Sequence, residues 1–264
     1  AARRGAPPRA CDGGAVARGS LLKVVHRVAD PDAVSSFYTE ALGLESLPAE
    51  GERKLLATGG SLPQLELLHA DDGAFGDGAG YRGLSMRVPN VTTAVAAATA
   101  HGGSVLEDAK EVAHGPSNEP VEDDEVITPV VEAVVADPCG FPVHLYEEAA
   151  CGGATLCGVR LDVYEWKQSS EWWAELGWTQ LRWQSDVPRA ASMSVLLGGP
   201  GADGTVGPVG AASEAEAAPL LSLRYVYGCP AKEGPSGLEA IVLAAGDGGA
   251  AEMRDLDANP IRLE

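Results

Sequence analysis

The sequence predicts an α+β protein assembled from repeated strand–helix–three-strand (βαβββ) modules. Residues 21–28 form an apolar-rich run that reads as a strand, and an amphipathic helix and a glycine stop at Gly43 follow it. Residues 54–58 and 64–69 read as two further strands joined by a turn-rich segment. A second round with the same order of elements begins at Arg82.

The first helix is predicted from its start signal and from its apolar spacing. Asp30 and Pro31 stand where a helix begins, because a short acidic side chain caps the first turn and proline suits the first helical position. The apolar residues that follow recur at helical spacing: Val34, Phe37, Tyr38, Ala41 and Leu42.

The second module repeats this pattern. We expect a strand through Val88, an N-cap at Asn90 and an alanine-rich helix that ends before Gly102. Strands near Val105 and in two later segments, 127–136 and 141–147, complete it. Two such modules side by side are expected to curl into one half-open barrel with a concave face, which makes residues 19–148 the first domain.

A third round begins after a linker at 149–155. Residues 156–178 repeat the strand, the helix and the glycine stop, and the pair Trp172-Trp173 takes the place of Phe37-Tyr38. The strand-like segment 220–226 is expected to open a fourth module, in which proline and glycine leave little room for a helix. The chain therefore carries four modules, the last one eroded, and residues 156–264 form the second half-barrel domain.

Charge and composition exclude several partners. The formal net charge of −19 over 264 residues opposes binding to nucleic acid and to anionic membrane surfaces. No apolar stretch is long enough to span a bilayer, so we expect a soluble or peripheral protein. The five cysteines are scattered without a CxxC pair, which is typical of a reducing compartment. The acidic segment 119–125 is either a docking site for a basic partner or a solvated loop.

The N-terminal segment 1–18 contrasts with this acidic body. It is rich in alanine and arginine and holds one acidic residue, Asp12. Such a composition is typical of the remainder of an organelle transit peptide, with a chloroplast favoured over a mitochondrion, and it equally suits a disordered tail.

Three stretches resemble a known family. FYTEALGL at 37–44, RGLSMRVPNV at 82–91 and DPCGFPVHLYE at 137–147 resemble glyoxalase I and the wider vicinal-oxygen-chelate superfamily, in particular the two-domain proteins of plants and algae. The resemblance implies a Ni or Zn site in a concave face. Four side chains, two from each of two modules and usually His, Gln or Glu, would hold the metal and leave positions open for an enediolate.

The ligand positions of the family fall on residues that bind metals poorly. In the first half they are Lys23, Glu66, Gly83 and His144. In the second half they are Gly158, roughly Leu221, and Arg262, with no identifiable acid. Neither pairing within a domain nor pairing across domains supplies three good donors, so the sequence predicts no metal cofactor. Lys23 and Glu66 are expected to form an ion pair in place of the ion.

Arg27 and the histidines are the other charged candidates. The resemblance implies that Arg27 binds a glutathione carboxylate, and the alternative is an ion pair with an acid such as Glu66. In the third module the corresponding residue is Asp162, a reversed charge. His26 is predicted to be packed against the helix. Three other histidines are predicted to lie on the surface: His69, His101 and His114.

The tryptophans are concentrated in the third module. All five occur there: Trp166, Trp172, Trp173, Trp178 and Trp183. Core packing accounts for such a group, and any exposed member would mark a contact with a partner, since tryptophan is enriched at binding hot spots.

Three functional hypotheses follow. The first is a binding or structural protein that has lost catalysis, such as an accessory subunit of a larger organellar assembly, for example a photosynthetic one. The second, on the resemblance alone, is an active lactoylglutathione lyase that isomerises the hemithioacetal of methylglyoxal and glutathione, with Glu66 as ligand or base. The third is a metal-free binder of a small molecule.

Overall fold

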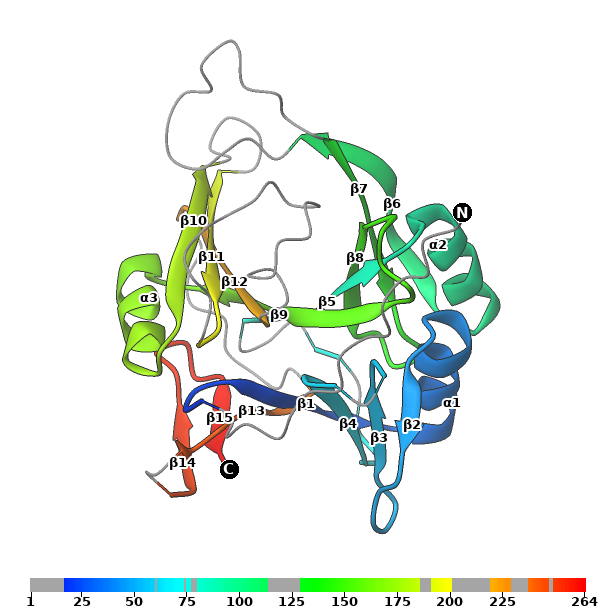
Figure 1. Ribbon diagram of the computed structural model, residues 1–264, viewed down its shortest axis with the longest axis horizontal. Helices are drawn as coiled ribbons and strands as arrows, with labels where there is room; N and C mark the ends of the chain where they lie inside the picture. Colours follow the sequence, from blue (N-terminus) through cyan, green and yellow to red (C-terminus); the bar gives the residue numbers. More distant parts are fainter. Residues whose placement is uncertain are drawn as a thin grey trace, which may run out of the picture.

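The computed structural model describes residues 17–59, 61–73, 75–76, 80–113, 129–185, 191–200, 219–228, 237–246 and 249–264. Predictions that fall on residues 1–16, on the acidic segment 119–125 and on His114 lie outside this part of the chain. Within it, the strands form two sheets of seven and eight strands, with three short helical segments beside them (Figure 1).

The first module has the predicted order. Its elements are β1 (Leu21–Val28), α1 (Pro31–Ser36), η1 (Phe37–Ala41), β2 (Glu45–Leu47), β3 (Lys54–Ala57) and β4 (Gln64–His69). The carboxylate of Asp30 accepts a hydrogen bond from the Ala33 amide, which caps α1 as predicted. The helix closes with one π-helical turn, and Gly43 then adopts a φ of +71°, a conformation that glycine takes without steric cost.

The second and third modules follow the same order. The second contains β5 (Tyr81–Val88), α2 (Val91–Ala100), β6 (Ser104–Ala113), β7 (Pro129–Ala136) and β8 (Pro142–Glu147). The third contains β9 (Thr155–Val163), α3 (Trp166–Glu175), β10 (Thr179–Ser185), β11 (Ser192–Gly198) and β12 (Leu220–Val226). The side chain of Asn90 accepts from the Thr93 amide, so the predicted N-cap of α2 is confirmed.

The start of the fourth module differs from the prediction. Strand β12 pairs in parallel with β9, as β4 pairs with β1, so residues 220–226 close the third module instead of opening the fourth. The described part of the fourth module holds three strands and no helix: β13 (Leu238–Leu243), β14 (Ala251–Arg254) and β15 (Pro260–Leu263). The prediction rested on the likeness in sequence of this segment to residues 82–91, which open the second module.

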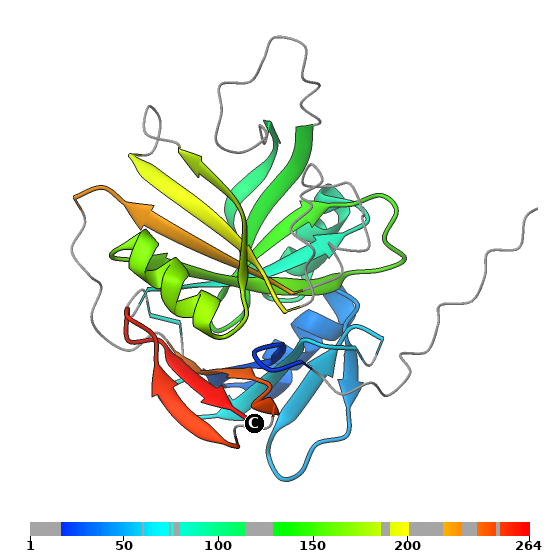
Figure 2. The same ribbon diagram turned by 60° about the vertical axis from the view of Figure 1, so that its left-hand side comes forward.

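The modules also combine differently from the prediction. The seven-stranded sheet has the order β14-β15-β13-β1-β4-β3-β2, and the eight-stranded sheet has the order β10-β11-β12-β9-β5-β8-β7-β6. The first module therefore joins the fourth through β1 and β13, and the second joins the third through β5 and β9 (Figures 1 and 2). The predicted α+β fold of βαβββ modules in two half-barrels is confirmed, but each sheet joins modules that are not consecutive, so it draws strands from both predicted domains, 19–148 and 156–264.

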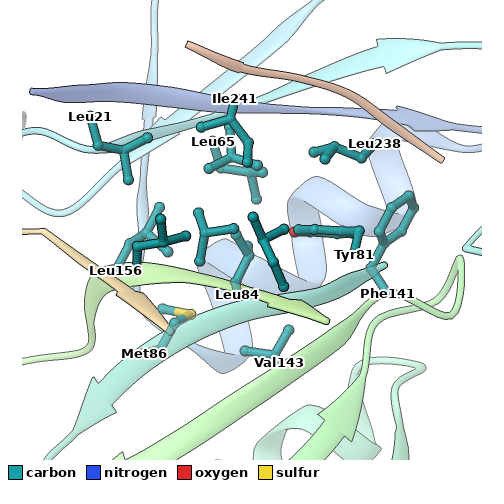
Figure 3. Packing of buried hydrophobic residues seen from close by; sticks show 14 of the residues in the cluster. Leu21, Leu65, Tyr81, Leu84, Met86, Phe141, Val143, Leu156, Leu238 and Ile241 are labelled. Carbon is teal, nitrogen blue, oxygen red and sulfur yellow. The ribbon is translucent and has the colours of Figure 1, made fainter. Parts of the chain in front are cut away.

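One large apolar cluster holds the two sheets together. Figure 3 shows side chains of β1, β4 and β13 lying against side chains of β5 and β9, with Leu21, Leu65 and Ile241 on one side and Leu84 and Leu156 on the other. Side chains of all three helices belong to the same cluster. The opposite, concave face of each sheet is therefore free to carry polar side chains.

His26 lies inside this cluster. Its side chain is fully buried, its ring stacks on Phe141 at 4.0 Å between centroids, and its Nε2 atom lies 2.6 Å from the hydroxyl of Tyr81. The prediction of a packed histidine is confirmed, although the ring contacts residues of the second module instead of the helix. Burial lowers the pKa of His26 to about 3. Of the three histidines predicted to lie on the surface, the structure describes two, His69 and His101, which lie nearer the surface beside acidic side chains.

The burial of His26 predicts a loss of stability in acid. Between pH 6.5 and about 3 only the unfolded chain takes up the proton, so lowering the pH favours unfolding. We expect the free energy of unfolding of the wild type, measured by urea denaturation, to fall relative to that of His26→Phe by about 1.4 kcal/mol per pH unit in this range. Parallel pH profiles for the two proteins would contradict the buried, neutral imidazole.

Candidate functional site

An ion pair occupies the concave face of the seven-stranded sheet. The Nζ atom of Lys23, on β1, lies 2.9 Å from one carboxylate oxygen of Glu66, on the adjacent strand β4. The other oxygen of Glu66 lies 3.4 Å from the guanidinium of Arg53. The side chain of Glu66 is only 8% exposed. The ion pair that the sequence predicted between Lys23 and Glu66 is therefore present.

The surroundings of Lys23 favour its charged form. Burial by itself lowers the pKa of this ammonium, but the hydrogen bond and the charge of Glu66, together with Glu264 at 3.4 Å, outweigh burial and raise it. A protonated lysine has three donors and no lone pair, so Lys23 cannot coordinate a cation.

Strand register identifies the two remaining ligand positions on this sheet. Strand β13 stands to β15 as β5 stands to β8, and the two registers equate Arg262 with His144. The residue of β13 that pairs with Arg262 comes two residues after Ala240, and the residue of β5 that pairs with His144 comes two residues after Gly83. The registers therefore also equate Ala240 with Gly83. The prediction of Leu221 for this position is wrong, because Leu221 is buried in the main cluster on β12.

The four positions on this sheet do not fit a metal ion. They hold Lys23, Glu66, Ala240 and Arg262, which supply one carboxylate, one methyl group and two cations. Arg262 is paired with Glu239 at 2.7 Å and with Glu252 at 3.3 Å. A divalent cation needs several N or O donors, and two fixed positive charges oppose its entry. Beside these ion pairs the face is apolar: it carries a small buried cluster of Val25, Ala240 and Val242, with Leu22 and Leu68 packed against it.

Glycines occupy two of the corresponding positions on the eight-stranded sheet. Gly83 has a φ of +107°, and a Cβ atom there would lie 2.0 Å from the carbonyl oxygen of Pro142. A Cβ atom at Gly158 would lie 2.1 Å from the carbonyl oxygen of Leu220. The backbone is therefore too close for any side chain at either position, and no donor fits there.

His144 is the remaining imidazole at these positions, and both of its nitrogens are engaged. Its Nε2 lies 3.2 Å from the backbone oxygen of Arg82, and its Nδ1 lies 3.1 Å from the guanidinium of Arg160. A carbonyl only accepts and a guanidinium only donates, so Nε2 carries the proton and the Nδ1 lone pair is used. Burial, and then the charges of Arg160 and Arg82, hold the pKa of His144 well below its usual range.

Comparisons with known proteins agree with this fold. Residues 23–146 match the sequence profile of the glyoxalase-like domain. This part of the chain is therefore similar to a glyoxalase-like domain. The resemblance inferred from its sequence motifs is thereby confirmed. No curated protein sequence matches the chain.

Solved structures of glyoxalase-like proteins match almost the whole chain. Glyoxalase I from Zea mays superposes with a TM-score of 0.67 at 20% identity, over 92% of this chain and 91% of that one. Its V278E mutant gives a TM-score of 0.70 at 20% identity, with the same coverage. A putative dioxygenase from Bacillus subtilis gives 0.60 at 11% identity, over 94% of this chain and 86% of that one. At these identities the likeness establishes the fold alone.

The glyoxalase-like site residues predicted from the sequence lie on two different sheets. Lys23 and Glu66 belong to the seven-stranded sheet, and Gly83 and His144 belong to the eight-stranded sheet. In the part of the chain that the structure describes, no three His, Cys, Asp or Glu side chains are grouped so that they could hold a metal ion. The same part contains no helix long and apolar enough to cross a membrane.

Arg27 does not contact Glu66. It lies near the end of β1 with its side chain 49% exposed, and its guanidinium lies 3.4 Å from Asp72. The alternative of an ion pair with an acid is therefore present, but the acid is Asp72. Glu66 is out of reach because the two residues are at different levels of the parallel β1–β4 pair: Glu66 lies opposite Val25, and Arg27 opposite Leu68.

The five tryptophans are buried in the core to different degrees. Trp173 and Trp178 are buried and meet edge to face at 5.6 Å, and the indole of Trp178 donates to the backbone oxygen of Gly19. Trp166, Trp172 and Trp183 are partly buried and pack against the main cluster. A contact of these three with a partner stays a prediction.

The sequence did not reveal a group of arginines on the eight-stranded sheet. Arg82 of β5, Arg160 of β9 and Arg224 of β12 come together around Asp162 and His144. The sequence did contain one signal: Arg160 and Asp162 are two residues apart on one strand, so their side chains lie on the same face. Finding their neighbours required the pairing of three strands that are far apart in the sequence.

A metal site can be rebuilt only within one sheet. We expect the triple variant Lys23→His, Ala240→His and Arg262→Glu, with Glu66 retained, to bind Ni²⁺ or Zn²⁺ stoichiometrically in isothermal titration calorimetry. The three changes remove both cations and present four donors on adjacent strands.

A matched control divides the donors between the sheets. The variant Lys23→His with His144→Glu also gains donors, but no face receives more than two of them. We expect no stoichiometric metal binding by this variant. Equal binding by both variants would contradict the assignment of the positions to sheets, provided that circular dichroism shows both to be folded.

Proposed function

We propose that this glyoxalase-like protein is a binding protein that works without a metal ion. The observation that carries the proposal is the ion pair of Lys23 and Glu66 at two ligand positions of the seven-stranded sheet. Both carboxylate oxygens of Glu66 already face cations, one on Lys23 and one on Arg53. An incoming metal ion would have to displace both.

Metal-dependent isomerisation needs more than the remaining residues supply. Such a reaction moves a proton with a carboxylate base and stabilises the resulting enediolate on a Lewis acid with open positions. On the seven-stranded sheet the base would be Glu66, the only acid at the four positions, and no second donor lies there. The alternative of lactoylglutathione lyase activity therefore rests on the similarity of fold to maize glyoxalase I.

Metal analysis combined with an activity assay tests this proposal. We expect purified protein, incubated with Ni²⁺ or Zn²⁺ and desalted, to retain well under one equivalent of metal. We also expect no turnover of methylglyoxal and glutathione, with maize glyoxalase I assayed alongside as the positive control. Stoichiometric metal together with turnover would overturn the proposal in favour of the lyase.

A role in a larger assembly is the second candidate function. The partly buried indoles of Trp166, Trp172 and Trp183 leave some apolar surface for a protein partner. The composition of residues 1–18 favours an organelle, and a chloroplast before a mitochondrion, as the place of that assembly. Gel filtration of native extracts tests this role: elution of the chain at the size of a monomer would contradict it.

A further inference from the structure

Three guanidinium groups lie together on the concave face of the eight-stranded sheet, and two of them share one carboxylate. Arg224 makes a two-pronged contact with Asp162, with its Nε at 2.7 Å and its Nη2 at 2.9 Å from the two oxygens. Arg82 lies 3.7 Å from the same carboxylate. Arg160 points its guanidinium at Nδ1 of His144, an uncharged partner. Arg82, Arg160 and Arg224, here called the arginine cluster, thus have three positive charges and one negative charge among them.

The other charged groups nearby leave this excess in place. Glu107 and Lys110 form a pair at 2.7 Å and offset each other. With Glu132 they line a small hollow, partly open to solvent, whose wall also includes His144 and Tyr146. Glu132 is the only further acid among the described residues that line the hollow, and it lies on β7, separated from β9 and its Arg160 by two strands, β5 and β8. A positive group of this kind stands out in a chain with a net charge of −19.

The surroundings of the arginine cluster are unfavourable for its positive charges. Burial, and then the charges of Arg224 and Arg160, lower the pKa of Arg82 despite the opposing charge of Asp162. The Nε atom of Arg160 is buried and has no hydrogen-bond partner among the described residues. The guanidinium of Arg160 also lies over the ring of Tyr146, 5.4 Å from its centroid, which orients it. Donors and positive charge are therefore in excess of what the described residues satisfy.

We propose that the arginine cluster binds an oxyanion, the carboxylate or phosphate group of a small molecule. The planar guanidinium fork matches the two oxygens of such a group. Side chains of the cluster reach solvent, with Arg82 25% exposed and Arg224 34% exposed. The inference rests on the proposed function in one respect, namely that a metal-free concave face is where the ligand is held.

Titration with inorganic phosphate tests this assignment. The full chain is treated with EDTA and titrated in a calorimeter, at constant ionic strength set with chloride. We expect saturable binding that Arg160→Gln weakens about ten-fold, because one charge-assisted hydrogen bond is lost. Glutamine keeps an N–H donor but carries no charge, so this variant removes the charge and leaves a polar side chain. A parallel titration with succinate shows whether the site prefers a carboxylate or a phosphate.

The matched control is Arg262→Gln. Arg262 lies at the position on the seven-stranded sheet that corresponds to His144, and two acids already pair with its guanidinium. We expect phosphate affinity to stay within two-fold of the wild type in this variant, within the scatter usual for sites that share no partners. An equal loss in both variants would overturn the assignment, because it would mean a general effect of charge.

A second series of titrations, with zinc present, separates the oxyanion site from the proposed metal-free function. Phosphate binding without zinc that Arg160→Gln weakens supports the arginine cluster, whatever the metal content of the protein proves to be. Absence of saturable binding of both phosphate and succinate, with and without zinc, overturns the oxyanion site and leaves the metal-free proposal standing. Binding that requires zinc overturns both.

Discussion

The antiparallel pairing of β1 with β13 decides which residues share a concave face, and the chemistry of the protein depends on it. Val25 lies opposite Ala240 across this seam, and β15 beyond it brings Arg262 to the same face as Lys23 and Glu66. The equivalent seam of β5 and β9 brings Arg160 beside His144 on the other sheet. Each face is thus built from modules that are distant in the sequence, and a charge in one module is balanced or left unbalanced by residues of another.

The two faces differ at the positions where the resemblance to glyoxalase I places metal ligands. On the seven-stranded sheet, two of these positions hold cations and a buried apolar cluster lies beside them. Each charge has a partner of opposite sign. On the eight-stranded sheet, close backbone contacts require glycine at 83 and at 158, so the face carries its charge on arginines instead. The first face is internally neutral around Glu66. The second keeps an excess of donors, which is why the proposed ligand site lies there.

Local elements could be predicted from the sequence, and long-range pairing could not. The first module follows from the cap at Asp30, the helical spacing and the stop at Gly43, all within a few residues of one another. The ion pair of Lys23 and Glu66 followed because β1 and β4 belong to one module. The choice of partner modules failed because every seam strand is equally apolar, so its pattern fits more than one neighbour. The placement of β12 failed because its sequence resembles that of residues 82–91, and the arginine cluster was missed because it needs that placement to be right.

The central claim is that the ion pair of Lys23 and Glu66 takes the place of the metal ion. The most direct measurement is a double-mutant cycle with Lys23→Met, Glu66→Gln and the double variant, followed by urea unfolding with and without Zn²⁺. The account predicts a favourable coupling energy of about 1 kcal/mol or more for this largely buried pair, and no stabilisation of the wild type by zinc. A coupling energy near zero, or a wild type that zinc stabilises through Glu66, would contradict it.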